Sequence, residues 1–378
     1  MVDKRYRNAL FAAAGLSLLV MVSNAFAQTA EQNAYSRYVR IGMEQMKIGN
    51  YQAARDSFQE AIRYNSTDFA AHLGLGIVYF HLRDDTHAER ELARAAEINP
   101  NEALVYQFLG ELYYRKDDFE TAASYWEKAA ALNPSAEDLR ARLERIKKER
   151  RTEKDFNRDA TSHFLIKYEG REKIEAGRIV LRILEDAYGE VGRALSYYPD
   201  HEIQVILYSD QQYQEVTDAP GWSGGIFDGK IRIPIGGIEQ ETTGLRKLLY
   251  HEYTHAVVRA ITPRCPTWLN EGLAQYFEAR ENDARQRTLL SQLAQAGRLP
   301  SLAALEGPFT GLSTDQAMYA YLFSLSSVRY MIDAFGPYRV KTVLDELAAG
   351  ASTSKAINSG LSLSYEEFER GWKRSLEQ

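Results

Sequence analysis

The stretch 251–255 reads His-Glu-Tyr-Thr-His, with two histidines four residues apart and a glutamate directly after the first. On a helix, residues i and i+4 lie on one face, so both imidazole rings can ligate one metal ion. Zn²⁺ accepts imidazole nitrogens at about 2.0–2.1 Å. Glu252 then projects beside the ion, where its carboxylate can take a proton from a coordinated water. The pattern predicts a zinc site that hydrolyses peptide bonds.

A second stretch supplies the ligand that this pattern lacks. Two half-buried histidines and a surface glutamate on an ordinary helix would give the same five letters, so the pattern by itself does not establish a metal site. Catalytic zinc needs three protein ligands and a fourth position open to water. Glu271 lies in the stretch 268–272, Trp-Leu-Asn-Glu-Gly, which follows Pro263 and Pro266. It is the expected third ligand, delivered by a second helix after a short turn.

The two stretches together resemble the gluzincin metallopeptidases, in which H-E-x-x-H precedes a glutamate ligand on the next helix. Residues 268–272 are similar to the second motif of the aminopeptidase branch. The gap of fifteen residues between His255 and Glu271 is shorter than in that branch and closer to compact peptidase MA-like domains of bacteria. The resemblance implies one Zn²⁺ held by His251, His255 and Glu271, with Glu252 as the base that assists attack of zinc-bound water.

Two further parts of such a site are less clear from the sequence. Related enzymes often stabilise the oxyanion with a Tyr or His from a later helix, and residues 321–330 resemble that helix. Tyr321 is the candidate, with Tyr319 as the alternate, although both aromatic side chains also fit a core. Some gluzincins carry an acid shortly after the glutamate ligand, where this chain has Ala274 and Gln275. We therefore expect another group, such as a backbone carbonyl, to orient His251.

Residues 35–136 repeat with a period of 34 residues. Small and large side chains recur in register: Gly42, Gly76 and Gly110; Ala54, Ala88 and Ala122; Phe58, Leu92 and Trp126; Ala61, Ala95 and Ala129. The pattern strongly resembles three tetratricopeptide repeats, which stack helix pairs into an α-solenoid with a concave surface for a protein partner. Residues 137–151 are expected to form the capping helix. Tyr38, His72 and Tyr106 could line the concave surface, or could simply pack.

The first 27 residues are typical of a signal peptide. A basic start with Lys4 and Arg5 precedes an apolar run over 9–22, and residues 25–27, Ala-Phe-Ala, offer a cleavage site. The run is shorter than the roughly 20 residues that a membrane-spanning helix needs. We expect export to a bacterial periplasm and no membrane span after cleavage, with an uncleaved anchor as the alternative.

The net charge bears on nucleic-acid binding, and the cysteine content bears on disulfide formation. The formal net charge is −6, and loss of residues 1–27 removes a net +2, which leaves −8. This mild acidity argues against nucleic-acid binding. Cys265 is the single cysteine, so no intrachain disulfide forms, and its position in the turn between the two motifs indicates a bystander.

The rest of the chain must build the scaffold of the site. Residues 152–160 are polar and are expected to be a linker, and residues 161–378 to form an α+β, zincin-like metallopeptidase domain. Its expected start is a strand, a long helix and a second strand, followed by a hairpin that turns at 228–229. Pro234 cannot donate a ladder hydrogen bond, which places its strand at a sheet edge. That edge could pair with an extended substrate or could merely be capped.

The sequence therefore predicts an exported zinc peptidase whose repeats recruit protein substrates or partners. The competing hypothesis is a periplasmic scaffold that binds proteins through its repeats and whose peptidase domain has lost activity. The retention of His251, Glu252, His255 and Glu271 speaks against the scaffold, because drift usually removes the base or a ligand first.

Overall fold

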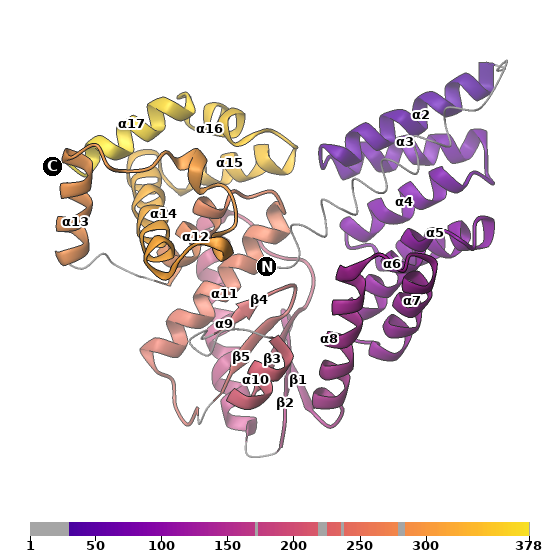
Figure 1. The fold of residues 1–378 in the computed structure, drawn as a ribbon, viewed down its shortest axis with the longest axis horizontal. Coiled ribbons are helices and arrows are strands. Elements are labelled where there is room, and N and C mark those ends of the chain that lie inside the picture. Colours follow the sequence, from indigo (N-terminus) through magenta and orange to yellow (C-terminus); the bar gives the residue numbers. More distant parts are fainter. Residues whose placement is uncertain (1–29, 171–172, 218–224, 236–237, 279–283, 378) are drawn as a thin grey trace. The chain divides into compact units, whose positions relative to one another are not determined.

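The computed structural model describes residues 30–170, 173–217, 225–235, 238–278 and 284–377 (Figure 1). The chain divides after Thr152 into two compact units, and each unit is described by itself. The expected signal peptide lies outside the described residues. Within the described residues, no helix is both long enough and apolar enough to cross a membrane.

The N-terminal unit consists of helices that pack in consecutive pairs: α2 with α3, α4 with α5, and α6 with α7 (Figure 1). Their bounds are α2 Ala30–Lys47, α3 Tyr51–Tyr64, α4 Phe69–His81, α5 Asp85–Ile98, α6 Ala103–Arg115 and α7 Phe119–Leu132. Helix α8, Glu137–Glu153, follows them and includes the expected capping helix. The predicted α-solenoid is confirmed.

Glycine and large apolar residues lie against each other within each pair, as their shared register predicts. A Cβ on Gly110 would meet Trp126 Cδ1 at 2.2 Å, and one on Gly76 would meet Leu92 Cγ at 2.8 Å. Trp126 is 2% exposed and Leu92 is fully buried. Because the missing Cβ atoms let the paired helices approach closely, the large side chains bury most of their apolar surface between them.

Two of the residues proposed for the concave surface are packing residues. His72 is 7% exposed; its Nδ1 lies 2.7 Å from Glu91 Oε2 and its Nε2 lies 3.1 Å from the Ser66 carbonyl oxygen. Tyr106 is 3% exposed and donates its hydroxyl to the Pro100 carbonyl at 3.1 Å. Buried polar groups with satisfied hydrogen bonds are ordinary core components, so neither side chain is available to a partner.

The C-terminal unit begins with a five-stranded sheet in the order β1-β2-β3-β5-β4. The strands are β1 Asn157–Ala160, β2 Phe164–Tyr168, β3 Ile203–Tyr208, β4 Ile226–Phe227 and β5 Ile231–Pro234. Strands β2, β3 and β5 are parallel to one another, and β1 and β4 pair antiparallel at the two edges. Helix α9, Ile174–Leu195, connects β2 to β3 and packs on the sheet.

Two local expectations need correction. Residues 152–160 contain the end of α8 and the edge strand β1, which pairs with β2 from Asn157 to Ala160, so this segment is not an unstructured linker. The strand that ends at Pro234 is not the edge, because β5 lies between β3 and β4. Pro234 is tolerated because it ends the strand, beyond the two residues that pair with β4. The edge on this side is β4, which enters the expected hairpin turn at 228–229.

Helices complete the unit, one between β3 and β4 and the others after the sheet. Their bounds are α10 Asp210–Thr217, α11 Thr243–Ile261, α12 Thr267–Phe277, α13 Ala284–Gln295, α14 Thr314–Phe335, α15 Pro337–Ala348, α16 Thr353–Leu361 and α17 Tyr365–Ser375. Capping boxes at Ser313 with Gln316 and at Ser364 with Glu367 begin α14 and α17. One apolar core joins α9, the sheet and α11 to the helices from α12 to α17, so the unit is the expected α+β arrangement.

Candidate metal centre

Helix α11 carries the His-Glu-Tyr-Thr-His stretch. The Thr242 hydroxyl caps its first turn by accepting from the Leu245 N–H at 3.1 Å, and the helix ends at Ile261, just before Pro263. One flank is anchored in the core, with Leu249 and Tyr253 fully buried. The other flank, with His251 and His255, remains partly open. Core packing of one face therefore turns both imidazoles toward the opposite side.

Helix α12 brings Glu271 to the same place. It begins after Pro266, and Trp268 is fully buried and donates its indole N–H to the Tyr365 hydroxyl at 3.0 Å. Gly272 faces α14, where a Cβ would lie 2.4 Å from the Ser324 carbonyl oxygen. The anchored tryptophan and the close approach at Gly272 set the position of the intervening Glu271 side chain.

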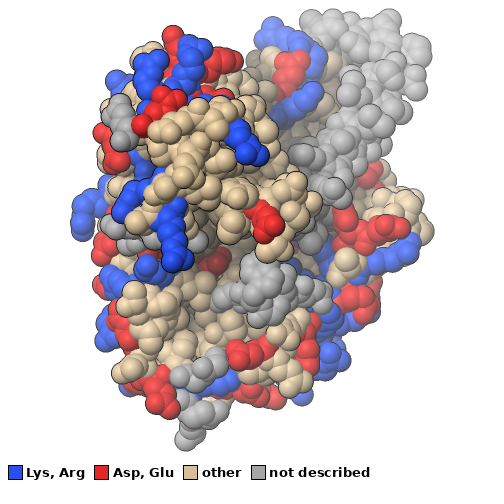
Figure 2. All heavy atoms as spheres, turned by 60° about the vertical axis from the view of Figure 1, so that its left-hand side comes forward, with Lys and Arg blue, Asp and Glu red and all other residues tan. Residues whose placement is uncertain are grey.

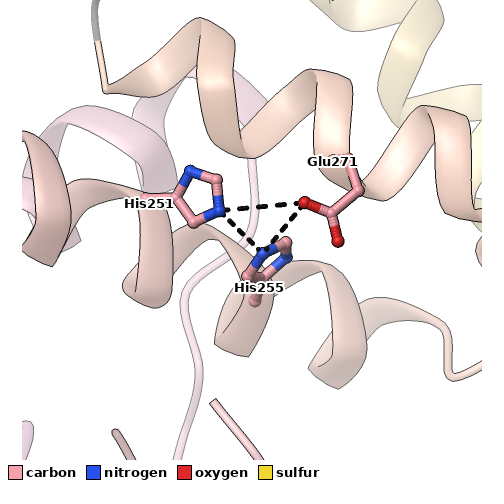
Figure 3. A group of neighbouring side chains, drawn as sticks. All are labelled: His251, His255 and Glu271. Atoms are coloured by element: carbon pink, nitrogen blue, oxygen red, sulfur yellow. Dashed lines mark hydrogen bonds and ion pairs between the residues drawn. The ribbon is translucent and has the colours of Figure 1, made fainter. Parts of the chain in front are cut away.

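The three side chains converge as a metal site requires (Figure 3). His251 Nε2 lies 3.1 Å from His255 Nε2, and Glu271 Oε2 lies 3.8 Å and 3.7 Å from these two nitrogens. Ligand atoms at tetrahedral positions around zinc are separated by about 3.3 Å. This donor set therefore fits Zn²⁺ closely. Among the described residues, it is the one group of three or more His, Cys, Asp or Glu found to be capable of holding a metal ion.

His251 is oriented by a carboxylate that the sequence reading missed. Its Nδ1 lies 2.9 Å from Glu278 Oε2, so Nδ1–H donates to Glu278 and Nε2 is turned toward Glu271. Burial alone would lower the pKa of His251, but the hydrogen bond that it donates to Glu278 and the charges of Glu252 and Glu271 raise this pKa to about 9. The expected backbone carbonyl is thus replaced by an acid two helical turns after Glu271. The seven-residue spacing on one helix face is the signal that could have found it.

Replacing Glu278 with alanine is expected to weaken zinc binding by about 10- to 100-fold, because His251 loses the group that fixes its ring and raises its basicity. Glu278→Gln, which keeps a hydrogen-bond acceptor but loses the charge, should fall between alanine and wild type. Zinc affinity measured by competition with a chromogenic chelator tests this. Glu239→Ala, at an exposed loop position, is the control and should bind like wild type. Equal zinc affinity in Glu278→Ala and wild type would contradict the positioning role.

Glu252 lies beside the converging ligands on the sheet side. It is 6% exposed and accepts a hydrogen bond from the backbone N–H of Phe227 in β4. Burial raises its pKa, and the neighbouring Glu271 charge acts in the same direction, whereas His251 and His255 lower it. A carboxylate made more basic by burial in this position can accept a proton from water next to the ligands.

Tyr321 lies on α14. Burial, followed by the charges of Glu271 and Glu252, raises the pKa of its hydroxyl and keeps this hydroxyl protonated. Gln275, 1% exposed, donates its amide to the carbonyl oxygens of Glu271 at 3.2 Å and Tyr321 at 3.1 Å. It therefore links the two helices at the ligand and at the candidate donor. Tyr319 stacks on Phe323 and packs against the core.

One face of the molecule is hollowed. Figure 2 shows one hollow on the face it views, with atoms of acidic residues inside it and Lys and Arg side chains along its rim. Ligand sites are typically concave, with a few polar groups that converge in them.

Comparison with known families agrees with this arrangement. Residues 194–378 match the model of the Peptidase MA superfamily. Residues 39–103 and 103–136 match two tetratricopeptide repeat models. The family match covers α11, α12 and α14, which carry the converging side chains.

Individual proteins are similar to this chain over short lengths. Anaphase-promoting complex subunit 3 of Schizosaccharomyces pombe is 33% identical over 111 residues, 29% of this chain and 16% of its own length. The BBSome complex member BBS4 of Bos taurus is 28% identical over 92 residues, 24% of this chain and 18% of its own length. This chain thus covers less than a fifth of the length of either relative. A solved structure, the first tetratricopeptide repeat domain of Spaghetti (RPAP3) bound to an HSP90 peptide, is 19% identical with a TM-score of 0.30, over 31% of this chain and 93% of that one.

Proposed function

We propose that this chain, which carries a Peptidase MA superfamily domain preceded by tetratricopeptide repeats, is a zinc-dependent peptidase of the gluzincin type. The observation that carries the proposal is the convergence of one ligand atom each from His251, His255 and Glu271 within 4.8 Å, with the Glu252 carboxylate beside them. Two imidazoles and a carboxylate with a buried neighbouring acid form the donor set that hydrolytic zinc uses.

The chain's own residues divide the chemistry between them. Zinc held by the three ligands would supply a Lewis acid that polarises the peptide carbonyl and lowers the pKa of water. Glu252 takes the proton from the attacking water at its carboxylate and passes it to the leaving nitrogen. Tyr321 donates its hydroxyl proton as a hydrogen bond to the oxygen that becomes negative during attack. Gln275 holds the Tyr321 backbone next to that of Glu271, so that ligand and donor keep their spacing.

The proposal also assigns roles to the repeats and to the N-terminal residues. Tetratricopeptide repeats present a surface to proteins or peptides, and we assign to them the recruitment of a protein substrate or partner. The basic and apolar start of residues 1–27 supports export to a periplasm.

Removal of metal is expected to abolish peptide hydrolysis by the full chain, and zinc is expected to restore it. The protein is dialysed against a chelator, and cleavage of a quenched peptide mixture is measured before and after addition of one equivalent of Zn²⁺. Mg²⁺ serves as the control, because it prefers oxygen ligands and should not restore activity. A chain that binds zinc yet cleaves no peptide would contradict the proposal and support the inactive scaffold.

A further inference from the structure

The candidate base Glu252 is contacted at two points by the chain around strand β4. A Cβ on Gly225, just before the strand, would lie 3.3 Å from Glu252 Cγ, so the bare backbone packs against the stem of this side chain. Two residues later, the Phe227 N–H donates a hydrogen bond to the Glu252 carboxylate. A carboxylate accepts through two oxygens, so one oxygen held by the N–H leaves the other to meet water. The position of β4 therefore sets the orientation of the base.

The backbone pairing of β4 is short. Its two residues, Ile226 and Phe227, pair antiparallel with Arg232 and Ile231 of β5. Two strands are at best marginally stable when nothing but their own pairing holds them together. The position of β4 therefore depends on the side chains that hold the hairpin in place.

Asp228 and Arg232 hold the turn of this hairpin. The Lys230 N–H donates to Asp228 Oδ1 at 3.3 Å, which closes the turn around Gly229, whose φ is +115°. Arg232 Nε donates to Asp228 Oδ2 at 3.2 Å. Because Asp228 directly follows Phe227 in the chain, an Asp228 side chain fixed in this way restrains the neighbouring N–H that reaches the base.

Arg232 is itself anchored in the interior of the unit. It is fully buried, and its Nη1 donates to the Tyr208 hydroxyl on β3 at 2.7 Å. That hydroxyl donates to Glu153, whose Oε2 accepts from Lys167 Nζ on β2 at 2.5 Å. A guanidinium is a rigid fork of donors, so its directions to Asp228 and to Tyr208 are fixed together. The Asp228 carboxylate is thus connected to β3 and β2 through buried side chains.

We propose that Asp228 and Arg232 are positioning residues for Glu252: their ion pair holds β4 so that the Phe227 N–H keeps the base turned toward the attacking water. Neither side chain needs to touch the substrate. Loss of the pair should misplace the base while leaving both the base and the zinc ligands present. This inference rests on the proposed peptidase function and adds two residues to it.

Asp228→Asn tests the pair with the least change of shape. Asparagine can still accept the Lys230 N–H, and Asn-Gly is a favoured hairpin turn, so the turn itself should persist. The charge that binds Arg232 is lost. On a blocked peptide, the zinc-loaded full chain is expected to lose about 10-fold in kcat, the size expected for one hydrogen bond to a charged group, with KM and zinc content unchanged. Arg232→Lys, whose single nitrogen cannot replace the fork between Asp228 and Tyr208, should give a similar loss.

Two readouts separate positioning from general damage to the fold. In a Glu252→Gln background, Asp228→Asn should cause no further loss of the residual hydrolysis, because the base on which it acts is gone. Hydrogen exchange at the Phe227 amide should become about 10-fold faster in Asp228→Asn, since the bond to Glu252 opens more often. Asp186→Asn is the matched control. It breaks an ion pair with Arg246, 2.9 Å away on α11, and should leave kcat and this exchange at wild-type values.

Wild-type kcat in Asp228→Asn, an equal loss with and without Glu252, or unchanged exchange at the Phe227 amide would overturn the inference while leaving a peptidase. Loss of zinc from Asp228→Asn would also overturn it, because the pair would then support the metal site rather than the base. Absence of cleavage of every peptide by wild type would remove the proposed function and this inference with it.

Discussion

Glu252→Gln should lose peptide hydrolysis by about 10²- to 10⁴-fold while zinc stays bound. Glutamine has nearly the same shape and can still accept the hydrogen bond from the Phe227 N–H. It cannot accept the proton of the attacking water, so the loss should be almost entirely in kcat. Since Glu252 is a buried acid with a raised pKa, its neutral replacement should fold at least as well as wild type.

The measurement combines kcat/KM on a blocked peptide with zinc content and thermal melting of the same sample. Glu239→Gln, the same change at an exposed loop position, controls for the substitution itself and should match wild type in all three readouts. Full hydrolysis by Glu252→Gln would remove Glu252 as the base. Loss of zinc together with activity would mean that Glu252 acts on the metal site rather than on water.

Most helices of this fold can be predicted from the sequence, because they leave strong local signals. The period of 34 residues places Gly110 against Trp126, and capping residues such as Thr242 and Ser313 mark where helices begin. The Pro residues near 263 end one helix and begin the next. Such signals depend on residues within one or two turns, so they can be recognised without knowledge of the tertiary structure.

The parts of the fold that the sequence does not predict depend on contacts between segments that are distant along the chain. Strand β1 consists of exposed polar residues with no alternating pattern, and it forms because its backbone pairs with β2. The order of β4 and β5 depends on which strand meets β3, and Pro234 constrains only its own N–H. Sheet order is therefore the part of this fold that the sequence leaves open.

The candidate site also contains residues that the sequence predicts and residues that it does not. The spacing of His251, His255 and Glu271 is local to two helices, and the structure brings these three side chains together as their motifs predict. Glu278 escaped notice because the expected acid was sought within a few residues of Glu271 rather than two turns away. Gln275 stands where an orienting acid was sought, and its role depends on contact with α14, which no local pattern reveals.

Glu271→Ala is expected to weaken zinc binding by more than about 100-fold. Loss of a residue that only supports a ligand costs up to about 100-fold, and this substitution removes a ligand itself. Two histidines on one turn leave two open positions on a tetrahedral ion, and water fills them with little gain in affinity. Zinc per chain, measured after dialysis against a competing chelator, should be close to one in wild type and near zero in the variant. Retention of one zinc per chain by Glu271→Ala would exclude Glu271 as a ligand.

Thermal melting separates loss of the ligand from loss of the fold. Without zinc, Glu271→Ala should melt close to the wild-type temperature, because the substitution relieves the repulsion of the buried Glu252 but also removes the attraction of Glu271 to protonated His251. With zinc, wild type should gain stability according to ligand concentration over Kd, whereas the variant should gain almost none. A variant that melts much lower without zinc would instead show that the Glu271 side chain also supports the packing of α12 against α11. The zinc-dependent difference between the two melting curves therefore reports on the ligand role independently of the protein's intrinsic stability.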